Sequence, residues 1–197
     1  MSGKPSRRTV LSALAIAAVP GLAGCGESSA DQSAGFVSGD GIIEQVPPAE
    51  RKVLLSITGE LLQGGTYDSR ELLGMVVVYN VWGSWCAPCR EEAPALRKVA
   101  DETRPDGVRF MGINVRDNDA SALAFERRYD ITYPSIRTAD SQEALLAFGS
   151  KLPPSAVPST MIVDREGRLA ARVIGKTSYG TLSALVEDVL AEDGGRG

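Results

Sequence analysis

The chain has 197 residues, a formal net charge of −4 and no histidine. The negative charge argues against nucleic acid as a partner, and the lack of histidine excludes Ser-His-Asp and Cys-His catalysis and removes the commonest metal ligand. The hydrophobic content of 43% is ordinary for a globular protein. Three cysteines cannot form a disulfide framework, so we expect one domain stabilised by its own core.

Residues 1–24 have the pattern of an export signal. Lys4, Arg7 and Arg8 form a basic start, and about ten apolar residues follow before the chain reaches Pro20. A bilayer span needs about 20 apolar residues, so a cleaved signal peptide fits better than a transmembrane helix. A buried N-terminal helix is the alternative.

Residues 22–25, Leu-Ala-Gly-Cys, resemble the lipobox of bacterial lipoproteins. The resemblance implies that Cys25 is lipidated and becomes the N-terminus, with residues 25–39 as a flexible polar tether. The lipid would hold the protein at the outer face of the cytoplasmic membrane. Arg7 and Arg8 also resemble a twin-arginine export signal, and the general export route remains open.

Residues 40–197 are predicted to form one α/β domain. Runs with a period of two or of continuous apolar residues predict strands, and periods near 3.6 predict helices. In chain order we first expect an edge strand at 41–46, a hairpin from 53–57 and 60–67, and a buried strand at 75–81. A helix from 86 to about 103, a buried strand at 108–115, a helix at 119–129 and an extended piece at 131–134 should follow. The last part should contain a helix at 142–148, a hairpin from 160–164 and 169–174, and a helix at 182–190. This order predicts a mixed central sheet flanked by helices on both faces.

Two cysteines stand between the predicted strand at 75–81 and the helix after it. Cys86 and Cys89 are spaced as Cys-x-x-Cys at a helix start, where the helix dipole and unpaired N–H groups favour a thiolate. We therefore expect Cys86 to be nucleophilic and Cys89, one helical turn along, to resolve a mixed disulfide. A structural disulfide or metal binding remains an alternative, although a zinc site would need two further ligands.

A family resemblance rests on two segments: residues 80–96, NVWGSWCAPCREEAPAL, and residues 157–164, VPSTMIVD. They resemble the membrane-anchored TlpA- and ResA-type thiol–disulfide oxidoreductases, and the likeness extends over roughly residues 40–192. The resemblance implies a thioredoxin fold with an N-terminal β-hairpin and a central helix–strand insert at 117–137.

The resemblance also assigns roles around the thiols. It implies that Cys86 is the attacking thiolate, that Cys89 is the resolving thiol, and that Pro158 is a cis-proline facing them. The backbone of Val157 would then be free to pair with an extended substrate. An ordinary trans loop proline is the alternative for Pro158.

The substrate surface is expected to include Trp85, Ala87 and Pro88, which lie beside the thiols in the chain. Trp82 is expected in the core, where its indole N–H needs one partner. Arg90 either helps to hold the thiols ionised or is a solvated helix residue.

The proton relay is predicted from two further positions. Thioredoxin has a buried aspartate where this chain has Asn80, and an amide cannot carry the proton. ResA-type proteins have a glutamate three residues after the second cysteine, and Glu92 matches it, which implies that Glu92 takes the proton of Cys89. The alternative is that Glu92, like Glu91, is a first-turn glutamate favoured by the helix dipole.

The family implies a reductase of protein disulfides outside the cytoplasm, with apocytochrome c as the substrate class and a membrane electron donor of the CcdA type as partner. No cofactor and no metal are expected. DsbA-type oxidants have a histidine between their cysteines, whereas Ala87 and Pro88 are closer to the thioredoxin pattern. The alternatives are an oxidant or isomerase for exported proteins, and an anchored binding lipoprotein whose disulfide is only structural.

Overall fold

The structure is a computed structural model, and it describes residues 36–38 and 41–192. The predicted signal peptide, the lipidation site at Cys25 and the tether up to residue 35 lie outside the described residues. Within the described ranges, no helix combines the length and the apolar character that crossing a bilayer requires.

A mixed seven-stranded sheet forms the centre of the domain, as predicted, and its strand order is β1-β2-β9-β8-β5-β6-β7. The central strand β5 runs parallel to β6 and antiparallel to β8. The strands of this sheet are β1 (Phe36–Ser38), β2 (Gly41–Gln45), β5 (Val76–Trp82), β6 (Val108–Asn114), β7 (Ser135–Ile136), β8 (Ser159–Val163) and β9 (Leu169–Ile174).

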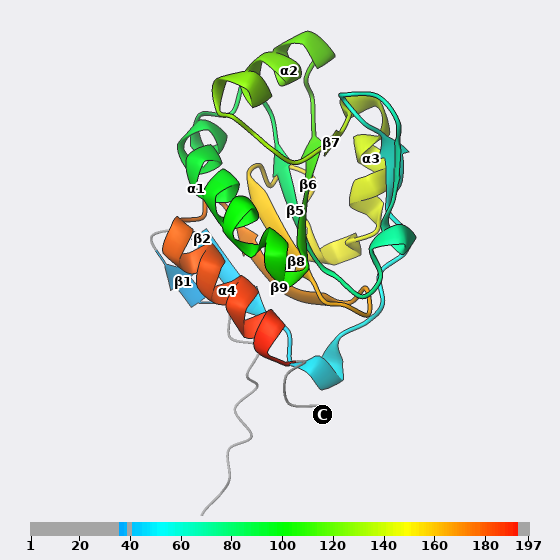
Figure 1. The fold of residues 1–197 in the computed structure, drawn as a ribbon, viewed down its shortest axis with the longest axis vertical. Helices are drawn as coiled ribbons and strands as arrows, with labels where there is room; N and C mark the ends of the chain where they lie inside the picture. The colour runs from blue at the N-terminus through cyan, green and yellow to red at the C-terminus, as the bar shows by residue number, and fades with distance from the viewer. Residues whose placement is uncertain (1–35, 39–40, 193–197) are drawn as a thin grey trace, which may run out of the picture. The chain divides into compact units, whose positions relative to one another are not determined.

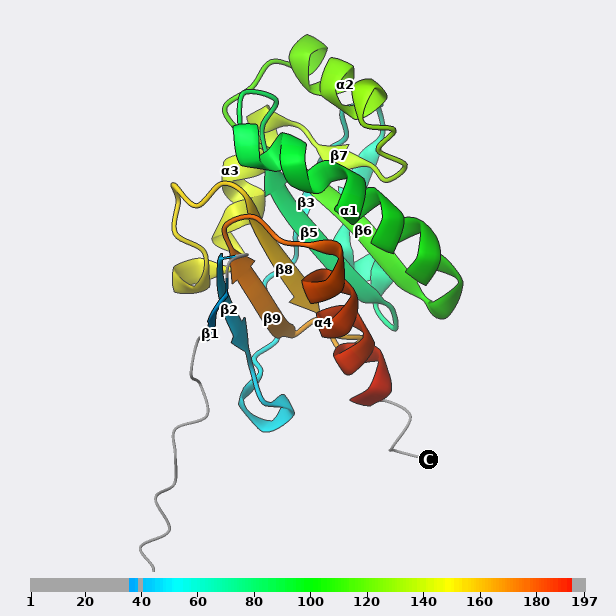
Figure 2. The same cartoon turned by 90° about the vertical axis from the view of Figure 1, so that its left-hand side faces the viewer.

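Helices cover both faces of this sheet. Helices α1 and α4 lie against one face and α3 lies against the other, while α2 lies near the end of the sheet where α1 begins (Figure 1, Figure 2). The α-helices are α1 (Ala87–Thr103), α2 (Asp119–Arg128), α3 (Thr138–Leu146) and α4 (Tyr179–Ala191). Short 3-10 helices are η1 (Pro48–Glu50), η2 (Ser69–Leu72), η3 (Arg104–Asp106) and η4 (Gly149–Lys151).

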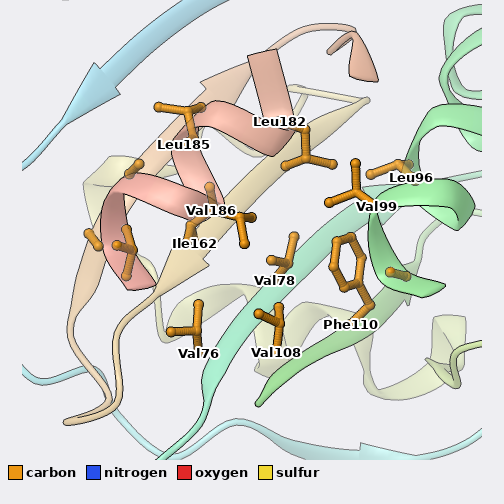
Figure 3. Packing of buried hydrophobic residues seen from close by; sticks show 14 of the residues in the cluster. Val76, Val78, Leu96, Val99, Val108, Phe110, Ile162, Leu182, Leu185 and Val186 are labelled. Atoms are coloured by element: carbon orange, nitrogen blue, oxygen red, sulfur yellow. The ribbon is translucent and has the colours of Figure 1, made fainter. Parts of the chain in front are cut away.

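Strand β5 divides the core because its successive side chains point to opposite faces. Val76 and Val78 belong to the core cluster under α1 and α4, which also contains Leu182 of α4 (Figure 3). Val77 and Tyr79 belong to the second core cluster, on the side of α3. All seven residues of β5 are buried, as expected for a central strand. The same alternation places Asn80 on the side of α1.

The N-terminal part of the domain differs from the prediction. Strand β1 falls within the predicted tether and pairs with β2, so the tether is wrong for residues 36–38 and β2 is not the edge of the sheet. Pairing with β1 satisfies the backbone groups that an edge strand would leave free.

A hairpin is present, but the prediction is wrong for its first strand, which follows residues 53–57 instead of coinciding with them. Its strands are β3 (Thr58–Glu60) and β4 (Thr66–Asp68), and the turn at residues 64–65 is as predicted. Residues 53–57 are not a strand, because their backbone bonds to neighbouring loops. The Leu54 N–H donates to the Gly167 carbonyl, and the Ile57 N–H donates to Ser69 Oγ.

The helix–strand insert at 117–137 is confirmed, since it contains α2 and β7. The extended piece lies later than predicted, because Ser135 and Ile136 rather than 131–134 pair with β6. Helix α3 begins at Thr138, four residues before the predicted start at 142. The Thr138 hydroxyl donates to Asn114 Oδ1 over 2.8 Å and ties this first turn to the end of β6.

Candidate active site

The two cysteines lie where β5 ends and the chain turns into α1. Cys86 is the N-cap residue of α1, and Cys89 lies in its first turn. A disulfide with an S–S distance of 2.09 Å joins them, and the Cys89 N–H donates to Cys86 Sγ over 3.2 Å. Because the two residues are only 3% and 1% exposed, a partner must approach the sulfurs past the residues around them.

The residues beside the cysteines form an exposed surface. Trp85 is 47% exposed, and Ala87 and Pro88 are also exposed. The Trp85 indole N–H donates to the Val115 carbonyl over 3.2 Å, which fixes the ring. Gly83 leaves room for this ring, because a Cβ at residue 83 would lie 2.5 Å from Trp85 Nε1. This exposure supports the prediction of a substrate surface, which stays a prediction.

Asp117 braces the loop that precedes the disulfide. Its carboxylate accepts the Ser84 N–H over 2.7 Å and the Ser84 hydroxyl over 2.9 Å. Asn114 Nδ2 donates to the same carboxylate over 3.3 Å. The sequence pattern predicts Asp117 only as the start of the insert, although an aspartate just after a buried strand is an available signal for a functional residue. Arg90 donates to the Ser84 carbonyl over 2.9 Å, so this side chain also braces the loop.

The Val157–Pro158 peptide bond is cis, as predicted. Val157 is half-buried and packs against the cluster that contains both cysteines. In the part of the chain that the structure describes, the N–H and carbonyl of Val157 have no hydrogen-bond partner. Val157 thus combines a half-buried position with free backbone groups beside the cluster that contains the disulfide, and its role in binding a substrate stays a prediction.

Glu92 lies on the inner face of α1, one turn after Cys89, and is 1% exposed. Its Oε1 accepts a hydrogen bond from Asn80 Nδ2 over 2.9 Å, and its Oε2 accepts one from the Thr177 N–H over 3.0 Å. Burial raises the pKa of Glu92 to about 7, although the Thr177 N–H and the Asn80 amide oppose the rise. A carboxyl with this pKa can take up and release a proton near neutral pH.

Glu91 provides the contrast. This neighbouring glutamate is exposed and pairs with Lys176 over 2.9 Å, and the ion pair lowers its pKa. Glu91 therefore matches the description of a solvated first-turn glutamate, whereas Glu92 does not. The role of Glu92 as a proton acceptor stays a prediction.

Asn80 comes from β5, directly opposite Thr160 of β8. It is 2% exposed, and its amide also approaches Thr160 Oγ1 at 3.4 Å. The residue that replaces thioredoxin's aspartate thus serves as a hydrogen-bond donor to the carboxyl of Glu92. Glu92, the residue predicted to carry the proton, lies on α1 rather than on the strand.

Another buried carboxyl, Glu126 of α2, is 5% exposed and is not predicted from the sequence. Its neighbour Phe125 stacks on Trp82, which is buried as predicted. The Trp82 indole N–H donates to Ser135 Oγ over 3.3 Å. Burial raises the pKa of Glu126, and the Ser135 hydroxyl and the Gln63 amide lower it. A charged residue in a helical pattern is expected to be solvent-exposed, so the sequence contains no signal for the burial of Glu126.

The arrangement supports thiol–disulfide exchange. It combines a Cys-x-x-Cys pair at a helix N-terminus, a cis-proline platform and a buried carboxyl with a near-neutral pKa. Within residues 36–38 and 41–192, no three His, Cys, Asp or Glu side chains gather as a metal site would require.

Comparisons with known proteins agree with this site. Residues 45–172 match the AhpC/TSA family. A thiol-disulfide oxidoreductase ResA from Bacillus cereus is 23% identical over 128 residues, which cover 65% of this chain and 71% of the relative.

Solved structures give the same result. A DsbF homologue from Corynebacterium diphtheriae is 32% identical with a TM-score of 0.69, and the match covers 74% of this chain and 92% of that chain. A secreted thiol-disulfide isomerase from Corynebacterium glutamicum is 29% identical with a TM-score of 0.71, covering 80% of this chain and 97% of that chain. These similarities confirm the predicted thioredoxin fold, and the chain belongs to the AhpC/TSA family as a ResA-like thiol–disulfide oxidoreductase.

Proposed function

We propose that this protein is an extracytoplasmic reductase of protein disulfides. The observation that carries the proposal is the pairing of a buried Cys86–Cys89 disulfide with Glu92, one helical turn behind Cys89. The site has the two thiols that exchange needs and a carboxyl able to accept a proton from the second thiol.

In the reduced protein, the Cys86 thiolate attacks one sulfur of the substrate disulfide. A Cys86–substrate S–S bond forms, the substrate S–S bond breaks, and one substrate cysteine leaves as a thiolate. Cys89 then gives its proton to Glu92 and attacks Cys86 Sγ, which releases the second substrate cysteine. The substrate gains two electrons, both of its thiolates take up protons from Glu92 and solvent, and the protein is left with the Cys86–Cys89 disulfide.

The free backbone groups of Val157 would pair with an extended segment of the substrate, and Trp85 would contact it. Apocytochrome c, whose haem-attachment cysteines must be reduced, is the proposed substrate class. A membrane electron donor of the CcdA type would reduce the Cys86–Cys89 disulfide again. The proposed location is the outer face of the cytoplasmic membrane, after export and lipidation of Cys25.

The first test is turbidimetric insulin reduction with dithiothreitol as the electron donor. We expect activity from the parent protein and none from Cys86→Ser. The second test is a Cys89→Ser trap in cells, which should accumulate mixed disulfides through Cys86 with exported proteins that contain paired cysteines. A folded protein that is inert toward insulin and captures nothing would instead be a binding lipoprotein.

An isomerase or oxidant is the second candidate, because the relative from Corynebacterium glutamicum is named an isomerase. The reduction potential of the Cys86–Cys89 pair separates the two candidates. We expect a value close to thioredoxin, about −270 mV, since the motif has no histidine between its cysteines. A value close to DsbA, about −120 mV, would identify an oxidant.

A further inference from the structure

A cavity of about 320 Å³ lies beside the cis-proline platform. It is bounded by the ends of β5 and β6, by α3 and by the loop that leads to Pro158. Most of its wall is apolar, from Val81, Val115, Leu145, Leu152, Ala156 and Val157. An apolar hollow that includes Val157 in its wall offers a place for a substrate side chain.

Val157 connects this cavity to the disulfide. It packs against the cluster that contains Cys86 and Cys89, and it also packs against the core cluster that underlies the cavity. Its backbone N–H and carbonyl are unpaired within the described residues. Side chains of an extended segment alternate between faces, so a segment that pairs with Val157 directs every second side chain toward one side of the platform.

Arg116 lies at the rim of the same cavity and has an unusual conformation. Its φ of 51° is in the left-handed region, which is uncommon for a residue other than glycine. Its guanidinium lies over the Trp85 ring, 4.6 Å from the ring centroid. The stacked, left-handed conformation holds a positive charge between the exposed Trp85 and the cavity.

Arg116 forms no ion pair with a carboxylate of the described residues. Arg137 and Arg172, in contrast, each form ion pairs with glutamate or aspartate side chains. The planar guanidinium of Arg116 is therefore available to a carboxylate from another molecule, which it can bind through two hydrogen bonds.

We propose that Arg116 and this cavity select the substrate segment. The preferred segment is extended and carries, within a few residues of its disulfide cysteine, one apolar side chain for the cavity and one acidic side chain for Arg116. This inference rests on the proposed function and adds the chemistry of the substrate to it. The surface acts before any bond changes, by raising the affinity of the encounter that precedes attack by Cys86.

The test uses two peptides, each with one intramolecular disulfide, that differ only in Asp or Lys beside the attacked cysteine. The reduced parent protein should reduce the Asp peptide about fivefold faster than the Lys peptide, which is the range of an exposed ion pair. Arg116→Glu should reverse this ratio. Arg116→Gly, which keeps the left-handed backbone accessible, should bring the ratio close to one.

A charge-matched control is Arg127→Glu, an exposed position on α2, which should leave the ratio as in the parent. For the cavity, Ala156→Leu should reduce the preference for a peptide with Leu over one with Ser at the neighbouring position. Equal ratios in the parent and Arg116→Glu would overturn the proposal.

Reduction of 2-hydroxyethyl disulfide, a small uncharged substrate, tests the proposed function separately. If the parent fails that assay, the reductase function is wrong, whereas activity there without peptide discrimination contradicts the selection by Arg116.

Discussion

Glu92 of α1 and Glu126 of α2 are both buried carboxyls, but they differ in the hydrogen bonds that they accept and in their position relative to Cys89. Burial raises the pKa of both groups. Both also lie close to Tyr133, whose pKa is raised first by burial and then by the charges of Glu92 and Glu126.

Their hydrogen bonds differ. Each oxygen of Glu92 has an N–H donor, from Asn80 and from Thr177. In Glu126, Oε2 accepts from the Gln63 amide, but Oε1 has no partner in the described part of the chain. Only Glu92 combines donors for its charged form with a position one turn from the resolving cysteine. Donors to both oxygens and a position on the active-site helix distinguish Glu92 as the predicted proton acceptor.

The largest expected effect is on the exchange rate. Glu92→Gln removes the proton acceptor of Cys89, so the resolution step should slow by about 100-fold near pH 7, within the usual range for general-base catalysis. Stopped-flow single turnovers of reduced protein with a disulfide peptide measure this step, and the inflection near pH 7 should disappear. Glu91→Gln is the matched control and should behave as the parent. Superimposable pH–rate profiles of Glu92→Gln and the parent would show that Glu92 is only a structural residue.

The next effect is on stability. An acid whose pKa is raised in the folded state binds its proton more tightly there, so its stabilising contribution is present below the unfolded value of 4.5 and is lost as the pH rises through about 7. The free energy of unfolding of the parent, relative to Glu92→Gln, should therefore fall by up to about 3 kcal/mol across this window. Urea unfolding of both proteins between pH 4 and about 8 measures the difference. A difference that does not change with pH would contradict the raised pKa.

Asn80 should have an intermediate effect on Glu92. Asn80→Leu removes the donor to Oε1 and leaves only the Thr177 N–H, so the carboxylate becomes harder to form. The pKa of Glu92 should rise by about one further unit, the equivalent of one hydrogen bond to a charged group. Carboxyl-carbon NMR titration measures the shift. Thr160→Val, which keeps the Asn80–Glu92 bond, is the control, and an unchanged titration of Glu92 in Asn80→Leu would show that this bond does not stabilise the charge.

The smallest effect is expected for Glu126. Glu126→Gln removes a buried charge that has one unpartnered oxygen, so the free energy of unfolding at pH 8 should rise by about 1 kcal/mol. Disulfide exchange should stay within about twofold of the parent, because Glu126 is not next to the resolving cysteine. Slow exchange in this variant, comparable to Glu92→Gln, would remove the distinction between the two carboxyls.

Much of the fold could be predicted from local patterns. The apolar run 76–82 and the apolar spacing of α1 and α4 depend on side-chain periods of two and 3.6, which are written in neighbouring residues. Segments without a clear period were the ones placed wrongly. Residues 53–57 have the apolar composition of a strand, but their backbone bonds to other segments. Strand β1 lies in a polar region whose composition is typical of a tether.

Local sequence patterns place Cys86 and Cys89 at a helix start after a buried strand, with Glu92 on the same helix. The groups around these residues come from distant parts of the chain, and folding of the whole domain brings them there. Thr177 reaches Glu92 from 85 residues away, and Asp117 reaches Ser84 from 33 residues away. The burial of Glu126 also appears only in the folded domain. These features depend on strand register and helix packing between distant segments, which no local pattern of residues encodes.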